Sequence, residues 1–181
     1  MLETRSTDLV SRRYLHVHGA QVRATYTETL AVSREGFTRA VLGYRRADAE
    51  DLFLERYLDV PIELCLSQAL GRPVPRGSVI EIGNLAADDA FAMVALWASA
   101  ANDLAGACEI AVATLTAPLR RMFTRMGVPL YVLAPATLDR AGDAGEWGRY
   151  YASNPVVCAG LIAPGQEAIG AYLASRRGIA A

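Results

Sequence analysis

A carboxyl group and a carboxamide interrupt an otherwise apolar stretch, "SVIEIGNLAA", at residues 78–87. Apolar residues typical of a buried strand surround Glu81, and Gly83 and Asn84, which strands disfavour, come next. Burial raises the pKa of a carboxyl group toward the range in which it accepts protons near neutral pH. Glu81 is therefore a candidate for proton transfer, with Asn84 beside it. Two structural explanations stay open, because a buried Glu can pair with an arginine and an Asn after Gly can turn the chain.

Other combinations of reactive residues are sparse. His16 and His18 would share one face of a predicted strand, but no third ligand is near, so we expect no metal site. Cys65, Cys108 and Cys158 lie far apart in apolar surroundings, and we expect three reduced, buried thiols. The chain has no lysine, which excludes a Schiff-base lysine and a Walker-type phosphate lysine. GxSxG, GxGxxG and HExxH are also absent.

An acidic stripe is the remaining polar pattern. Glu55, Asp59 and Glu63 recur at spacing four and would share one side of a helix. Both a solvated helix face and a site for a cationic acceptor explain such a stripe. The solvated face is the simpler expectation.

The composition indicates a soluble globular protein. The 181 residues are 52% hydrophobic and 20% charged, and we expect a single domain over residues 1–181. The net charge of −1 provides no basic field for nucleic acid. The N-terminal residues carry charges and no apolar core of a secretory signal. The longest apolar run, residues 90–101, is shorter than the roughly 20 residues that span a bilayer, so we expect a cytoplasmic protein.

The elements that must position Glu81 form a mixed pattern. A short helix and an antiparallel hairpin turning at Glu35–Gly36 are followed by a helical region and then by alternating strands and helices. This order predicts a mixed-sheet α/β or α+β fold with helices packed on the sheet. The predicted strands are 22–30, 37–44, 78–86, 107–115, 128–134 and 156–163; the predicted helices are 8–14, 48–70 (with a second helix starting at Pro61), 90–104, 116–127 and 164–175.

Four stretches in this order and spacing carry a family resemblance. They are "LFLERYLDVPIE" (52–63), "VIEIGNLAA" (79–87), "LRRMFTRMGV" (119–128) and "WGRYYASNPVVCAG" (147–160). Together they resemble the thermostable hemolysin family, which is related in fold to GNAT acyltransferases and acyl-homoserine lactone synthases. The resemblance extends from about Tyr26 to Gly160. It implies a mostly antiparallel sheet whose fourth strand, here 78–86, is bulged and splays from the fifth.

The resemblance also implies a site in that gap. Gly83–Asn84 would form the bulge, since glycine tolerates unusual dihedrals. The extra residue would bring Asn84 and Ala86 to the face of Glu81. Glu81 would be the general base toward an amine acceptor, and Asn84 would orient the acceptor or polarise the thioester carbonyl. The exposed backbone of Leu85, Ala86 and Ala87 would bind the acyl-pantetheine arm.

The donor implied by the resemblance is an acyl thioester of coenzyme A or of an acyl carrier protein. Asp88 and Asp89 replace the glycine-rich loop that holds the pyrophosphate of coenzyme A in GNAT proteins, which weakens the case for that donor. Three arginines on one predicted helix would receive an acidic carrier protein, although solvated arginines are the simpler explanation. These residues are Arg120, Arg121 and Arg125.

Other residues are secondary candidates. Thr114, at the end of a predicted strand, and Arg120 would lie near the thioester. The aromatic residues of "EWGRYY", namely Trp147, Tyr150 and Tyr151, would line an acyl tunnel, protonate the leaving thiolate, or simply belong to the core.

The sequence therefore predicts an N-acyltransferase that moves a fatty acyl group from a pantetheine thioester to a small amine. It needs no metal and no tightly bound cofactor, and nothing indicates nucleic acid as a partner. The alternative is a non-enzymatic, membrane-active or regulatory protein on a degenerate GNAT scaffold. A lactone synthase, which would need S-adenosylmethionine as acceptor, is a third possibility.

Overall fold

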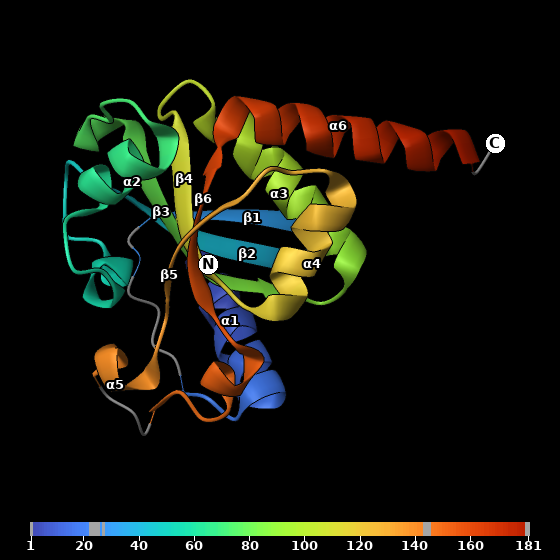
Figure 1. Cartoon of the computed structure of the whole chain (residues 1–181). Coiled ribbons are helices and arrows are strands. Elements are labelled where there is room, and N and C mark those ends of the chain that lie inside the picture. The colour runs from blue at the N-terminus through green and yellow to red at the C-terminus, as the bar shows by residue number, and fades with distance from the viewer. Residues whose placement is uncertain (1, 22–25, 27, 143–145, 180–181) are drawn as a thin grey trace.

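The structure is a computed structural model that describes residues 2–21, 26, 28–142 and 146–179. Over these residues the chain forms six strands and six α-helices, with short 3-10 helices between some of them (Figure 1). The strands are β1 (Glu28–Arg34), β2 (Phe37–Arg46), β3 (Val79–Ala87), β4 (Ile110–Leu115), β5 (Tyr131–Pro135) and β6 (Val156–Leu161). The α-helices are α1 (Leu2–His18), α2 (Ile62–Leu70), α3 (Ala90–Leu104), α4 (Ala117–Met126), α5 (Leu138–Ala141) and α6 (Ile162–Ile179), and the 3-10 helices are η1 (Phe53–Tyr57), η2 (Arg76–Ser78) and η4 (Tyr150–Ser153).

The strands form one mixed sheet in the order β1-β2-β3-β4-β6-β5. Only β3 and β4 pair in parallel, because α3 carries the chain back across one face of the sheet between them. All other neighbouring strands are antiparallel. The predicted mixed sheet flanked by helices is therefore confirmed.

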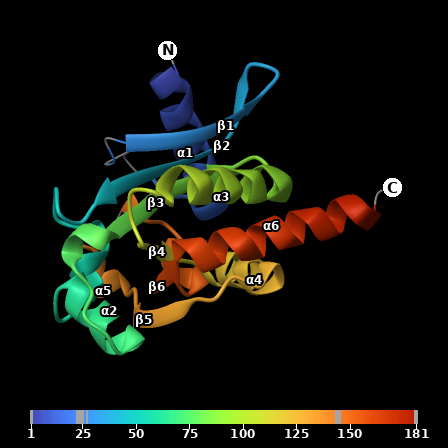
Figure 2. The same cartoon turned by 90° about the horizontal axis from the view of Figure 1, so that it is seen from above.

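Helices cover both faces of the sheet (Figure 2). On one face, Ile80 and Ile82 pack under α3, α4 and α6 in the larger core cluster. On the other face, Val79 packs with η1, α2 and α5, and Ala86 with α1. Because strand side chains alternate between faces, Glu81 must point toward the face of Val79.

The element boundaries follow local signals. Asp89 accepts a hydrogen bond from the backbone N–H of Ala92 at 2.8 Å and caps α3, as its position in the sequence indicates. Gly71 and Gly127 end α2 and α4 with φ of 65° and 74°, a conformation that glycine adopts without steric cost. The predicted turn at Glu35–Gly36 has φ of 55° and 80° and joins β1 to β2.

The secondary structure predicted for the N-terminal part differs from that in the structure. The predicted helix over residues 8–14 is the longer α1, and it includes His16 and His18 in its last turn instead of on a strand. Two residues apart on a helix, they cannot share one face as they would on a strand. The first hairpin strand begins at Glu28, and residues 22–25 and 27 of its predicted range lie outside the described residues. The short α5 was not predicted.

Candidate acyl-transfer site

The site begins where β3 and β4 part. The two strands pair only from Val79↔Ile110 to Ile82↔Ala113. Beyond that point β3 continues beside β2 and β4 continues beside β6. Gly83–Ala87 therefore has a strand on one side only, among the residues described. The predicted separation of this strand from the next is confirmed, although it is the third strand of the described chain and not the fourth.

A β-bulge lies at the point of separation. Gly43 pairs with Gly83 and Val41 with Ala86, so one residue of β2 opposes two of β3. Asn84 has φ of 47°, whereas Gly83 does not have a positive φ. The bulge is thus confirmed, but the expected reason for it is wrong, because Asn84 takes the unusual dihedral. The extra residue brings Ala86 to the face of Val79 and Glu81, as predicted.

Gly83 instead allows the Tyr26 side chain to lie close against β3. A Cβ at position 83 or at its pairing partner Gly43 would overlap the Tyr26 side chain. Two facing glycines therefore make the shallow space in which the phenol ring lies. The predicted strand over residues 22–30 includes Tyr26 but does not indicate this contact. The two glycines, one in each of two apolar strands, were the available signal.

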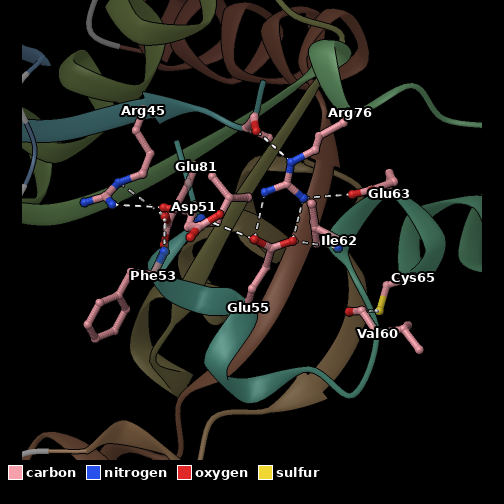
Figure 3. Close-up of polar contacts among 12 residues, drawn as sticks. Arg45, Asp51, Phe53, Glu55, Val60, Ile62, Glu63, Cys65, Arg76 and Glu81 are labelled. Carbon is pink, nitrogen blue, oxygen red and sulfur yellow. Dashed lines mark hydrogen bonds and ion pairs between the residues drawn. The ribbon is translucent and has the colours of Figure 1, made fainter. Parts of the chain in front are cut away.

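The Glu81 carboxylate is enclosed by donors (Figure 3). Only 2% of the residue is exposed, and its two oxygens accept hydrogen bonds from the backbone N–H groups of Phe53, at 2.8 Å, and Leu54, at 3.0 Å. Arg45 Nε lies 3.5 Å from the carboxylate, and the Tyr26 hydroxyl also hydrogen-bonds to it. The pairing of Glu81 with an arginine is thus present, and the carboxylate fixes the start of η1.

Burial dominates the electrostatics of this carboxylate. It raises the pKa of Glu81 above its ordinary value, while the Phe53 N–H, the Arg45 guanidinium, the Leu54 N–H and the Tyr26 hydroxyl act in the opposite direction. Burial of the Tyr26 phenol and the nearby Glu81 charge raise the pKa of Tyr26 well above its ordinary value. Arg45 also stacks on the Tyr26 ring, 4.3 Å from its centroid. Glu81, Tyr26 and Arg45 form one contact group, here called the Glu81 group.

The end of β4 faces this group across the gap. Thr114 follows the last residue of β4 that pairs with β3, and its side chain lies on the face of Val112 and Glu81. Its hydroxyl is buried and has no hydrogen-bond partner among the described residues. The Tyr150 hydroxyl donates to the Thr114 carbonyl oxygen at 3.4 Å. Burial raises the pKa of Tyr150 well above its ordinary value, so the phenol stays protonated.

Arg120 holds the end of β4. Its Nη1 donates to the carbonyl oxygens of Leu115, at 2.7 Å, and Asn154, at 2.9 Å. The guanidinium thus ties the strand to the loop after η4. Arg121 and Arg125, on the same helix, are exposed.

An aromatic cluster closes this side of the site. The Tyr57 and Tyr151 hydroxyls lie 2.6 Å apart, and Trp147 packs against both Tyr150 and Tyr151. The sequence is compatible with three roles for these aromatics, namely core packing, tunnel lining or protonation of the leaving thiolate. The structure adds residues from α1 and η1 to the cluster. The rings in contact are Tyr14, His18, Phe53, Tyr57, Trp147, Tyr150 and Tyr151.

An apolar cavity of about 70 Å³ lies on the opposite face of the sheet. Ile82 and Ala113, the last paired residues of β3 and β4, line its sheet side together with Leu115. Ala111 of β4 also lines it, and the remaining lining residues come from α3, α4, α6, β6 and the loop before β5: Trp97, Ala100, Ala101, Leu104, Phe123, Val128, Leu130, Cys158, Ala159, Gly160, Leu161, Ile162, Gly165 and Ile169. The gap between the strands thus has an apolar cavity on one face and the Glu81 group on the other.

The acidic residues predicted at spacing four do not share one helix: Glu55 lies in η1, Glu63 lies in α2, and the exposed Asp59 between them pairs with Arg140 at 2.8 Å. Arg76 bridges Glu55, at 2.6 and 2.8 Å, and Glu63, at 2.9 Å (Figure 3). Glu55 also accepts the backbone N–H groups of Leu52 and Ile62. These bonds, the Arg76 pair foremost, lower the pKa of Glu55 to about 2. The ion pairs fasten η1 and α2 to the start of β3.

The two aspartates after β3 are also paired. Arg39 lies 3.3 Å from Asp88 and 3.6 Å from Asp89, and Arg12 lies 3.4 Å from Asp88. Asp89 occupies the N-terminus of α3, where the resemblance places the pyrophosphate of coenzyme A. Within the described part of the chain, no group of three or more His, Cys, Asp or Glu residues could hold a metal ion. No helix there is long and apolar enough to cross a membrane.

The sheet order and the separation of β3 from β4 define a GNAT-like fold, and solved structures have the same fold. FeeM, an N-acyl amino acid synthase from uncultured soil microbes, aligns with a TM-score of 0.63 and 11% identity over 92% of this chain and 94% of its own. The acyl-homoserine lactone synthase LasI aligns with a TM-score of 0.58 and 10% identity over 87% and 81%. BjaI, a CoA-dependent acyl-homoserine lactone synthase, aligns with a TM-score of 0.59 and 13% identity over 94% and 79%.

The family is settled by sequence. The profile of the family described as thermostable hemolysin matches residues 2–166. The chain therefore belongs to the thermostable hemolysin family. No curated protein matches the sequence.

Proposed function

We propose that this protein is an N-acyltransferase that moves a fatty acyl group from a pantetheine thioester to a small amine. The observation that carries the proposal is the separation of β3 and β4 after Ile82 and Ala113, with an apolar cavity on one face and Glu81 on the other. The printed activities of the structural relatives support it, since FeeM is an N-acyl amino acid synthase and LasI and BjaI are acyl-homoserine lactone synthases.

The donor arm would lie in the gap between the strands. The backbone of Leu85, Ala86 and Ala87 has no strand on the β4 side among the described residues, so its amides can pair with those of pantetheine. The acyl chain would pass Ile82 and Ala113 into the apolar cavity. The thioester carbonyl would then lie close to the Thr114 hydroxyl, which lacks a partner in the described structure, and to Asn84. Both side chains can donate a hydrogen bond to the carbonyl oxygen as negative charge develops on it.

The amine would approach from the face of the Glu81 group. Its nitrogen attacks the thioester carbon, the C–N bond forms and the C–S bond breaks. The amine gives a proton to the Tyr26 oxygen while Tyr26 gives its own proton to Glu81, so the buried carboxylate acts as general base through the phenol. The hydrogen bond between Tyr26 and Glu81 and the raised pKa of Glu81 support this relay. The proton held by Glu81 would then return through Tyr26 to the departing thiolate, which leaves both groups in their starting protonation states; Tyr150, whose hydroxyl donates to the Thr114 carbonyl oxygen, would hold the end of β4 in place.

We propose an acyl carrier protein as the preferred carrier of the donor, with coenzyme A as the alternative. Asp89 already caps α3, and its charge disfavours a pyrophosphate there. Arg121 and Arg125 are exposed on α4 and suit an acidic carrier surface, whereas Arg120 supports the site by fixing the end of β4. Such donors occur in the cytoplasm, and we place the reaction there.

The non-enzymatic alternative receives less support. It requires side chains that fill the space where β3 and β4 part, whereas both strands line an open cavity there. A lactone synthase would need a site for S-adenosylmethionine, and no observation identifies one.

A thermal-shift screen tests whether the chain binds donors. A ligand that binds only the native state, at a free concentration about 100 times its Kd, adds roughly 2.7 kcal/mol to the free energy of unfolding. We expect acyl carrier protein thioesters and acyl-pantetheines to raise the Tm and free pantetheine to raise it less. An unchanged Tm with every thioester, including acyl-CoA, would leave the non-enzymatic alternative.

A further inference from the structure

One end of the apolar cavity lies away from the gap between β3 and β4. The two strands part after Ala113, and Ala111, two residues earlier on β4, pairs with Gly160 of β6. Both Ala111 and Gly160 line the cavity. Gly165, in the first turn of α6, lines it too, and α6 begins directly after β6. These residues define the end of the cavity remote from the gap, here called its far end.

Two glycines leave space at the far end. A Cβ at Gly160 would meet Leu130 Cδ2 and the Pro129 carbonyl oxygen, both at 3.6 Å. A Cβ at Gly165 would meet Val128 Cγ1 at 3.7 Å. These are ordinary van der Waals contacts, so an alanine fits at either position without displacing its neighbours. The added methyl group would occupy part of the space that the cavity now offers.

The volume of the cavity limits the chain that it can hold. An engineered apolar cavity of about 150 Å³ in another protein binds benzene, which has six carbon atoms. In the same proportion, a cavity of about 70 Å³ holds roughly three carbon atoms of an acyl chain. With the carbonyl carbon and about two more carbons in the gap beside Thr114, a chain of roughly six carbon atoms reaches the far end. Longer chains have no space left to enter.

We propose that the protein is selective for short acyl chains, of about four to six carbon atoms, and that Gly160 and Gly165 set this limit. The inference rests on the proposed acyl transfer. No residue that lines the cavity is charged, so the chain that fills it is an unsubstituted hydrocarbon. A side chain at either glycine would take the place of the terminal carbon atom of the longest chain that fits.

The test compares specificity constants on donors of increasing length. Acetyl-, butyryl-, hexanoyl-, octanoyl- and decanoyl-pantetheine are offered to the wild type with one amine that it accepts, and thiol release is followed. We expect kcat/KM to be highest for butyryl or hexanoyl and at least about tenfold lower for decanoyl, because a full pocket rejects further methylene groups. In Gly160→Ala and in Gly165→Ala, the ratio of kcat/KM for hexanoyl to that for acetyl should fall by about tenfold.

Gly170→Ala is the matched control on the same helix. Position 170 is exposed, and a Cβ there meets no atom within 4 Å, so the hexanoyl-to-acetyl ratio should stay at its wild-type value. An unchanged ratio in folded Gly160→Ala and Gly165→Ala would overturn the inference, as would a wild-type maximum at any other chain length.

A binding measurement keeps the length limit separate from the reaction. If no thioester reacts, the proposed acyl transfer fails, and the rise in Tm that each acyl-pantetheine produces then decides the limit. We expect the largest rise with butyryl or hexanoyl and a smaller one with decanoyl. A rise in Tm that does not fall between hexanoyl and decanoyl would contradict the limit on its own.

Discussion

The phenol ring of Tyr26 lies against the backbone of Gly83, in space that any side chain at position 83 would occupy. The ring is fixed there by its hydrogen bond to Glu81 and by the Arg45 guanidinium stacked on it. The absence of a side chain at position 83 thus lets the Tyr26 hydroxyl reach the buried carboxylate. This contact links the local irregularity of β3 to the chemistry proposed for it.

The contact predicts a specific loss of stability in Gly83→Ala. The new methyl group overlaps the Tyr26 ring, and overpacking of this kind costs about 1–3 kcal/mol. Urea unfolding measures the change in the free energy of unfolding. Gly106→Ala is the control, since a Cβ there meets no atom within 4 Å. In the Tyr26→Ala background the Gly83→Ala change should cost little, and a full cost in that background would show that the two residues do not collide.

Two substitutions of Asn84 distinguish its effect on the backbone of the bulge from its proposed role in catalysis. With φ of 47°, the position suits glycine and disfavours alanine, so Asn84→Ala should lose about 1 kcal/mol and Asn84→Gly should lose nothing. Both variants lack the amide proposed to donate to the thioester carbonyl. We therefore expect Asn84→Gly to keep its stability and to lose about 100-fold in kcat, within the range for loss of such a donor. Full activity in Asn84→Gly would limit Asn84 to shaping the bulge.

The Glu55–Arg76 pair predicts a dependence of stability on pH. The folded pKa of Glu55, about 2, is below its ordinary value of 4.5, so the carboxylate stabilises the fold above pH 4.5. This contribution is lost as the pH falls from about 4.5 to about 2. The free energy of unfolding of Glu55→Gln should therefore lie below that of the wild type at pH 7 and approach it in acid. Glu167→Gln, at an exposed position, is the control and should follow the wild type throughout. A difference that stays constant with pH would contradict the assignment.

The exposed Arg121 and Arg125 predict that the KM for the donor depends on whether an acyl carrier protein carries the acyl group. Their reversal to glutamate should raise the KM for an acyl carrier protein thioester by about tenfold, because an acidic carrier would meet negative charge. The KM for acyl-pantetheine, which has no carrier protein, should not change. Arg176→Glu, on a different helix, is the control for net charge and is compared with each single reversal, Arg121→Glu and Arg125→Glu. An equal effect on both donors would argue against a carrier protein at α4.

The sequence predicted the fold class and the irregular strand because both depend on local pattern. Gly83 and Asn84 inside an apolar strand identify a bulge, and Glu81 among Val79, Ile80 and Ile82 identifies a buried carboxyl. The sequence does not say which residue of the bulge takes the positive φ, because Gly and Asn both tolerate it.

The sequence alone does not predict contacts between distant segments. Glu55 and Glu63 form an obvious stripe, but their partner Arg76 becomes apparent only when α2 and β3 are packed together. Tyr26 reaches Glu81 only because Gly43 and Gly83 pair across β2 and β3. The histidines were misplaced because "YLHVH" alternates like a strand, while the helix that precedes it continues through the segment. In the first two cases the partner is distant in the sequence, and only the packing of the elements brings the residues together.

The central claim is that an amine takes an acyl group from a thioester in the gap between β3 and β4, with Tyr26 and Glu81 receiving its proton. The most direct measurement is mass-spectrometric detection of the amide formed from acyl-pantetheine and an amine panel by the wild type, Tyr26→Phe and Glu81→Gln, with folding checked by circular dichroism. The wild type should form the amide, and folded Tyr26→Phe should form it at least about 100-fold more slowly, in line with the loss of general base catalysis. Absence of amide with the wild type, or an undiminished rate in both variants, would contradict the claim.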